Sequence, residues 1–326
     1  MNLIHRRAGT VMPGRITLTG VALTGVGLTG GAMLLAGCGA FAEEPAGEGV
    51  VAAAFYPLEY AAARVAADHL TVESLTTPGV EPHDLELGIG ETAVVSDADL
   101  VVYQRGFQPA VDETVDNTAR GVVLDAAQAV SLVSFADHGE EGSGAEHEGH
   151  ENGETDPHFW LDPLLMADLG DALATSMAET DPAHADDYAV NTAALRDDLE
   201  TLDGEYAAGL ASCERDTVVV SHDAFGYLSR YGLHFESIAG LSPDSEPTPA
   251  DLSRLGDLIR TEGITTVFSE TLIGPALADT LAGDLGIRSA VLDPLEGLGD
   301  TSAGEDYLSL MRSNLTALEL ANGCAP

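Results

Sequence analysis

The chain has 326 residues, of which 54 are Asp or Glu and 13 are basic, giving a formal net charge of −41 at pH 7. All of the basic residues are Arg. A surface this acidic repels nucleic-acid phosphates and anionic lipid headgroups, so the composition excludes nucleic-acid partners and electrostatic docking on a membrane.

The N-terminal segment is typical of an exported lipoprotein. Three Arg residues precede or begin an apolar, glycine-rich run over residues 16–36, and small residues lead up to Cys38. A basic start, an apolar centre and small residues before the cleavage point describe a secretory signal. We therefore predict a signal peptide over residues 1–37, with Cys38 lipid-modified as the first mature residue and residues 38–49 as a tether.

The alternative for this segment is a transmembrane helix. The apolar run is rich in Gly and Thr, and no later segment reaches the about 20 apolar residues that a membrane span needs. We therefore expect acyl chains on Cys38 to anchor the protein to the outer face of the cytoplasmic membrane, in a periplasm or at a cell surface.

Two cysteines remain, Cys213 and Cys324. In an exported, oxidising setting an even pair is expected to form a disulfide, which would join the C-terminal helix to the first strand of the lobe that contains it. A cysteine metal site is the alternative. It is disfavoured because neither cysteine has a second one at metal-finger spacing.

Strands and helices alternate in the first half of the mature chain. Apolar runs that suit buried strands lie at 50–55, 70–75, 100–103 and 122–124, and helical patterns lie at 58–67, 89–97 and 110–118. Such alternation predicts parallel βαβ units whose sheet is covered on both faces. We assign residues 50–181 to this N-terminal lobe, including a histidine-rich acidic loop at 137–155.

A long helix follows. After a helical stretch at 164–179, Asp181 and Pro182 provide a cap and a first-turn proline for a second stretch at 182–211. At about 1.5 Å per residue this helix extends for about 40 Å, enough to bridge two lobes. We therefore assign residues 182–212 to a linking helix.

The alternation then restarts. Strands are predicted at 218–220, 235–238, 266–268 and 290–292, and helices at 224–231, 252–261, 275–285 and 307–320. Residues 213–326 therefore form a C-terminal lobe. The predicted fold class is α/β, with two lobes, each a mainly parallel sheet flanked by helices, bridged by one long helix.

Four side chains occupy loops that follow strands or precede helices, where open α/β sheets bind their ligands. They are His83, His158, His222 and Asp293. Singly, a histidine before a helix is often a cap or a packed core group, and an Asp before a proline can simply begin a turn. Two from each lobe, however, predict a metal site at the cleft, since imidazole and carboxylate are common metal ligands.

The loop histidines His138, His147 and His150 lie directly before His158 in the chain. A His/Glu/Gly tract beside a more rigid, proline-bracketed histidine suggests auxiliary metal capture. A solvated low-complexity linker is the alternative.

Four motifs occur in order along the chain: Pro-His-Asp at 82–84, Asp-Pro-His-Phe-Trp-Leu-Asp-Pro at 156–163, Ser-His-Asp-Ala-Phe-Gly-Tyr at 221–227, and Leu-Asp-Pro-Leu at 292–295. Together with the histidine-rich loop they resemble the zinc-binding receptors of bacterial metal ABC transporters. The resemblance covers nearly the whole mature chain. It implies the cluster A-I substrate-binding fold, with little hinge motion, and a monomer that serves a membrane permease and its ATPase.

The resemblance also carries the metal-ligand role to His83, His158, His222 and Asp293. Three imidazoles and one carboxylate suit tetrahedral Zn²⁺ as the transported ligand, whereas Mn²⁺ prefers more oxygen donors. Glu270 is expected beside the ligands or as a competing one. Neighbouring carboxylates can orient the imidazoles or cap helices instead; they are Asp84, Asp223 and Glu81.

Three alternatives remain open. A manganese receptor of the same family would share the fold. A zinc hydrolase could use the three histidines with Glu270 as a base, although the chain has no His-Glu-x-x-His motif and no nucleophile elbow. A surface adhesin or zinc buffer could use the same fold. We expect a receptor and not an enzyme.

Overall fold

The structure is a computed structural model, in which residues 49–134, 155–240, 243, 245–299, 302 and 304–325 are described. The chain divides into two units, Met1–Glu43 and Glu44–Pro326, and the architecture below is that of the second. The predicted signal peptide, Cys38 and the loop histidines His138, His147 and His150 lie outside the described residues. Among the helices that are described, none is long and apolar enough to cross a bilayer.

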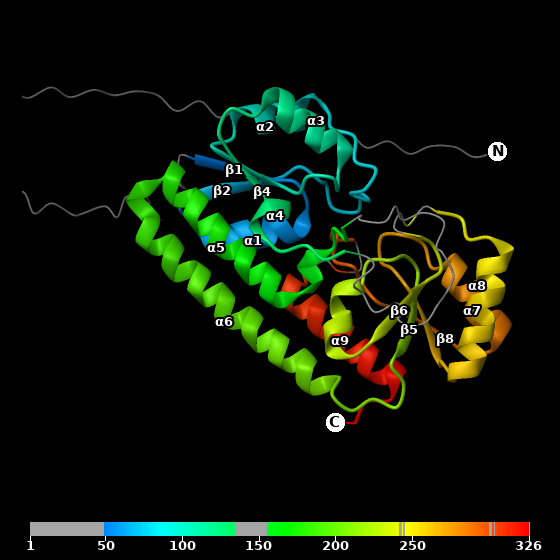
Figure 1. Cartoon of the computed structure of the whole chain (residues 1–326). Coiled ribbons are helices and arrows are strands. Elements are labelled where there is room, and N and C mark those ends of the chain that lie inside the picture. Colours follow the sequence, from blue (N-terminus) through cyan, green and yellow to red (C-terminus); the bar gives the residue numbers. More distant parts are fainter. Residues whose placement is uncertain are drawn as a thin grey trace, which may run out of the picture. The chain divides into compact units, whose positions relative to one another are not determined.

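The first lobe is built on a parallel four-stranded sheet in the order β2-β1-β3-β4. Its strands are β1 (Gly49–Ala53), β2 (Leu70–Ser74), β3 (Leu100–Tyr103) and β4 (Val122–Asp125). The crossover helices are α1 (Tyr56–Ala66), α2 (Ile89–Asp97) and α3 (Pro109–Thr118), and the short α4 (Ala126–Ala129) follows β4. Figure 1 shows α2 and α3 on one side of this sheet and α1 on the other. This lobe has the parallel βαβ organisation that the alternating pattern predicts.

The second lobe repeats the plan with the order β6-β5-β7-β8, again all parallel. Its strands are β5 (Thr217–Val220), β6 (His234–Ser237), β7 (Thr266–Ser269) and β8 (Arg288–Val291), and its helices are α7 (Pro249–Glu262), α8 (Ala276–Leu285) and α9 (Tyr307–Asn322). The helix that the sequence predicts at 224–231 is a 3-10 helix, η4 (Gly226–Tyr231). The predicted α/β class with two parallel sheets is confirmed.

A helical hairpin joins the lobes. It consists of α5 (Pro163–Thr180), the 3-10 turn η3 (Pro182–His184) and the long α6 (Ala185–Gly209). In Figure 1, α5 and α6 lie side by side, and α6 packs on α1 of the first lobe and on α9 of the second. Gly170 permits the close approach of the two hairpin helices, because a Cβ there would lie 3.0 Å from the Thr192 hydroxyl. The predicted bridging helix is present and begins one 3-10 turn later than expected.

The two lobes share one apolar core, and the second lobe also has a separate one. The shared core contains residues of both sheets, of α5, α6 and α9, and the fully buried Trp160. The indole N–H of Trp160 donates to the Pro294 carbonyl at 2.7 Å, and the Tyr307 hydroxyl donates to the Trp160 carbonyl at 2.5 Å. These bonds between residues 134 and 147 positions apart fasten the lobes to each other. The second core lies between the sheet and α7–α8, where Leu255 and Leu281 pack.

The disulfide between Cys213 and Cys324 is present, as the sequence predicts, and links the segment after α6 to the second residue after the end of α9. Its sequence separation is 111 residues. Closing so long a loop restricts the unfolded chain, and a native disulfide of this kind contributes about 2–4 kcal/mol to the free energy of unfolding.

The double substitution Cys213→Ser/Cys324→Ser should therefore lower the free energy of unfolding of residues 39–326 by about 2–4 kcal/mol, measured by urea denaturation. Reductant should have the same effect on the wild-type protein and none on the double variant. Equal urea midpoints for the oxidised wild type and the double variant would show that the bond does not stabilise the fold.

Candidate metal centre

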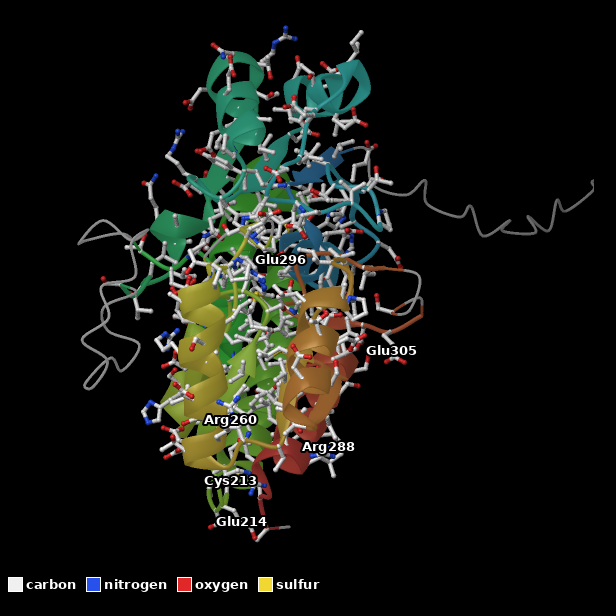
Figure 2. All side chains as sticks on the ribbon, turned by 90° about the vertical axis from the view of Figure 1, so that its right-hand side faces the viewer. Cys213, Glu214, Arg260, Arg288, Glu296 and Glu305 are labelled. Carbon is white, nitrogen blue, oxygen red and sulfur yellow. A yellow bond between two sulfur atoms is a disulfide. The ribbon has the colours of Figure 1, made fainter. Side chains whose placement is uncertain are left out.

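The three histidines that the sequence singles out come from three separate loops. His83 lies between β2 and α2, His158 directly precedes the 3-10 helix η2 (Phe159–Leu161), and His222 lies two residues after β5. Because the loops after parallel strands gather at one edge of a sheet, loops of both lobes can meet at one place. Figure 2 shows Glu296, with which all three histidines make contact, between the first lobe above and the second lobe below.

One carboxylate oxygen lies at the centre of this meeting point. The Nε2 atoms of three histidines each lie 3.3 Å from Oε1 of Glu296; the histidines are His83, His158 and His222. One potential ligand atom from each of these four residues lies within 4.8 Å of the other three. In a tetrahedral site with bonds of about 2.0–2.1 Å, neighbouring ligand atoms are about 3.3 Å apart. The spacing of the four side chains therefore fits a four-coordinate metal ion.

The centre is nearly closed to solvent. The side chains of His158, His222 and Glu296 are fully buried, and that of His83 is 13% exposed. Within the described residues, Nε2 of His158 and of His222 and the second oxygen of Glu296 make no hydrogen bond of good geometry. Buried polar atoms without such a bond are costly, and a bound cation would satisfy them.

Two further carboxylates fix the orientation of the buried imidazoles. Oδ1 of Asp156 lies 2.7 Å from Nδ1 of His158 and also accepts the backbone N–H of that residue at 2.8 Å. Oε1 of Glu270 lies 2.6 Å from Nδ1 of His222, and the Ser221 hydroxyl donates to the same oxygen. A proton on each Nδ1 leaves the lone pair of each Nε2 directed at Glu296, which is the arrangement that metal-binding histidines use.

The charges of the centre hold protons tightly in the absence of metal. Burial alone would lower the pKa of His158, but the carboxylates of Asp156 and Glu296 outweigh it and raise that pKa to about 9. Burial alone would raise the pKa of Glu296, yet the three surrounding histidines hold it well below its usual value. Burial, followed by the charge of Glu296, raises the pKa of Glu81 to about 8. Metal binding must therefore displace protons.

Asp293, which the sequence predicts as the fourth ligand, lies outside this group. Its Oδ2 accepts the Thr271 hydroxyl at 2.8 Å, and its Oδ1 accepts the backbone N–H of Leu295 at 2.8 Å. The carboxylate thus stabilises the turn after β8. Beginning a turn is the role, other than metal binding, that an Asp before a proline can have. Leu295 has a positive φ of 58°, and the sharp bend there precedes Glu296. The motif lies in the loop that reaches the group, but the carboxylate that meets the three histidines is that of Glu296, three residues after Asp293.

The other carboxylates that the sequence proposes near the ligands have different places. Glu270 lies against His222, and Glu81 accepts the backbone N–H of His83 at 3.2 Å. Asp84 is exposed, and Asp223 is half-buried, with its backbone N–H donating to the Gly240 carbonyl. Sequence reasoning missed Asp156. The motif Asp-Pro-His places this residue two positions before His158, a spacing at which an Asp side chain can bond to the backbone of the following turn.

The family described as "Zinc-uptake complex component A periplasmic" (ZnuA) matches residues 51–321. The chain belongs to the ZnuA family. A curated relative, zinc-binding lipoprotein AdcA of Streptococcus pneumoniae, is 36% identical over 278 residues, which cover 81% of this chain and 54% of AdcA. The high-affinity zinc uptake system protein ZnuA of Bacillus subtilis is 31% identical over 282 residues, which cover 82% of this chain and 86% of that protein. The chain thus spans about half the length of the AdcA relatives.

Solved structures of ZnuA-like proteins have the same fold. The Zn(II)-bound ZnuA-like domain of Streptococcus pneumoniae AdcA matches with a TM-score of 0.71 and 32% identity, covering 85% of this chain and 99% of that domain. The laminin-binding protein Lmb of Streptococcus agalactiae matches with a TM-score of 0.73 and 27% identity, covering 83% and 98%. The likeness shows that this chain has the ZnuA-like, cluster A-I fold.

Asp156→Asn should weaken Zn²⁺ binding by about 10–100-fold, because the amide no longer holds the Nδ1 proton of His158 as a carboxylate does. Competition with a chelator of known affinity measures this change. Asp84→Asn is the matched control, since Asp84 is exposed beside another histidine of the centre, and it should leave the affinity unchanged. Equal affinities in the two variants would contradict an orienting role for Asp156.

Proposed function

We propose that this protein is an extracytoplasmic receptor that binds Zn²⁺ and delivers it to an ABC importer. The observation that carries the proposal is the convergence of three imidazole Nε2 atoms at 3.3 Å on Oε1 of Glu296. The names of the AdcA and ZnuA relatives, which describe zinc binding and zinc uptake, support the same cargo.

The donor set favours zinc over manganese. Three nitrogens and one oxygen in a tetrahedron match the preference of Zn²⁺, whereas Mn²⁺ takes more oxygen ligands in larger coordination shells. Cu²⁺ and Ni²⁺ also bind imidazole, so their exclusion depends on geometry and on availability outside the cell.

The same donor set supports a receptor and not a hydrolase. Catalytic zinc keeps three protein ligands and leaves one position for water, but here four protein side chains converge. The family is one of substrate-binding receptors, in keeping with this arrangement.

The membrane attachment and the loop complete the proposal. Residues 1–37 would be removed, Cys38 would carry the lipid anchor, and residues 38–49 would tether a monomer to the outer face of the cytoplasmic membrane. His138, His147 and His150 would collect Zn²⁺ and pass it to the cleft. The importer's permease would then accept the ion while its ATPase drives transport.

Glu296→Gln should weaken Zn²⁺ binding by at least about tenfold, because it removes the negative ligand of the proposed site. Asp293→Asn is the control and should bind as the wild type does, since Asn keeps the shape and an oxygen acceptor for the turn. Chelator competition on residues 39–326 measures both. A large loss in Asp293→Asn with none in Glu296→Gln would assign the fourth ligand to Asp293 after all.

Uptake by cells tests the function itself. A strain without the gene should grow poorly at limiting zinc, and the wild-type gene, but not the Glu296→Gln gene, should restore ⁶⁵Zn uptake. Normal uptake in the deletion strain would favour a zinc buffer or an adhesin over a transport receptor.

Zinc affinity should rise with pH across the neutral range. In the metal-free protein the raised pKa of His158, about 9, means that this imidazole carries a second proton at neutral pH, whereas the metal-bound form cannot carry it. At pH values below the pKa of the metal-free protein, each displaced proton therefore weakens zinc binding about tenfold for every unit by which the pH falls. Calorimetry in buffers of different ionisation enthalpy should detect this proton release at about pH 7. Affinity that does not vary between about pH 6 and about pH 8 would contradict it.

A further inference from the structure

Two buried glutamines follow β3, one of the two inner strands of the first sheet, and contact loops that carry histidines of the metal centre. Gln104 and Gln108 are each 2% exposed, and neither belongs to the ligand set. Their segment, residues 104–108, is here named the β3 platform. Burying an amide costs free energy unless it is hydrogen-bonded, so the bonds of these two side chains indicate what the platform holds.

Each glutamine holds the peptide that leads into one histidine of the centre. Nε2 of Gln104 donates to the carbonyl of Pro157 at 2.7 Å, directly before His158. Nε2 of Gln108 donates to the carbonyl of Pro82 at 3.2 Å, directly before His83. Proline fixes its own φ, so a bond to its carbonyl fixes the plane of the peptide at which the histidine begins.

An aromatic ring of the platform contacts the same two imidazoles. The ring centroid of Phe107 lies 4.6 Å from that of His83 and 6.2 Å from that of His158, both in edge-on geometry. The platform therefore contacts the two first-lobe histidines through their backbone approach and through their rings.

The platform is itself held rigidly. It continues β3, whose four residues are all buried in the middle of the sheet. The backbone N–H of Arg105 donates to Asp125 at 3.1 Å, and that of Gly106 donates to Asp112 at 2.9 Å. Gly106 has a φ of 89°, which a residue with a Cβ rarely adopts.

We propose that Gln104 and Gln108 are positioning residues that fix His83 and His158 at the separation a tetrahedral ion requires, and so set the affinity and the preference for four-coordinate metals. This inference rests on the proposed zinc site. Both histidines reach the same oxygen, Oε1 of Glu296, at 3.3 Å, so a shift of either loop changes the size of the site. Structural Zn²⁺ sites are almost always tetrahedral, whereas Mn²⁺ suits octahedral oxygen sites and gains little from this geometry at the outset.

The test replaces each glutamine by methionine, which has the same length and no amide donor. In residues 39–326, Gln104→Met and Gln108→Met should each weaken Zn²⁺ binding by about tenfold, as the loss of a supporting contact beneath a ligand does. The visible ligand-field bands of bound Co²⁺ should shift or lose intensity as the tetrahedron distorts. Mn²⁺ affinity should change less, so the ratio of zinc to manganese affinity should fall.

Gln128→Met is the matched control. Gln128 is exposed in the same lobe, and its amide bonds to Asp125 and not to a loop that carries a histidine. Its zinc affinity and Co²⁺ spectrum should equal those of the wild type. The leucine variants Gln104→Leu and Gln108→Leu, which are uncharged and also lack the donor, provide the same test if a methionine variant does not fold.

Unchanged zinc affinity and an unchanged Co²⁺ spectrum in both donor-free variants would overturn the inference, even if the metal-free thermal midpoint fell, since that result would show a purely structural role. A wild-type protein that binds no zinc tightly would instead refute the proposed function. The two failures are therefore distinguishable.

Discussion

A carboxylate buried in the middle of a protein has to be compensated, and the arrangement of this molecule around Glu296 meets that requirement. Glu296 is 1% exposed and has three imidazoles around one of its oxygens. Transfer of an isolated charge from water into a protein interior costs many kcal/mol, so either protons on the imidazoles or a metal ion must balance it. The fastening of the lobes through Trp160 and Tyr307 keeps the compensating groups in place.

The sequence predicts the loops of the centre that local motifs mark. His83, His158 and His222 each occur in a loop with Pro, Asp or Gly neighbours, and the alternation of strands and helices places such loops at the edges of sheets. Whether Asp293 or Glu296 meets the histidines depends instead on which of the two carboxylates accepts the hydrogen bonds of the turn after β8. That depends on the Thr271 hydroxyl, 22 residues away, and on a positive φ at Leu295, neither of which has a signature in the sequence.

The hydrogen bonds of the two platform glutamines were beyond prediction for the same reason. Gln104 reaches Pro157 across 53 residues, and Gln108 reaches Pro82 across 26. A glutamine after a strand is ordinarily a solvated residue, and only the folded sheet shows that both amides face loops that carry metal ligands. The extent of the helices was easier to predict, since caps and periodicity fix it locally, and the predicted ranges lie within a few residues of the observed ones. The segment Gly226–Tyr231 differs in type, being a 3-10 helix, and the short α4 was not predicted.

The apolar interior is divided into two cores, so the surface helices α7 and α8 pack on a different set of residues from the one that packs near the metal centre. The core between α7, α8 and the second sheet is distinct from the one that surrounds Trp160 and extends beneath the histidines. A substitution on the buried face of α7 or α8 therefore changes the packing of the second core and not of the core that contains Trp160. Evolution can remodel that outer layer, and with it whatever the layer meets, while the chemistry that holds the ion stays constant. Proteins with one coordination site and different outer faces are the expected products of such a fold.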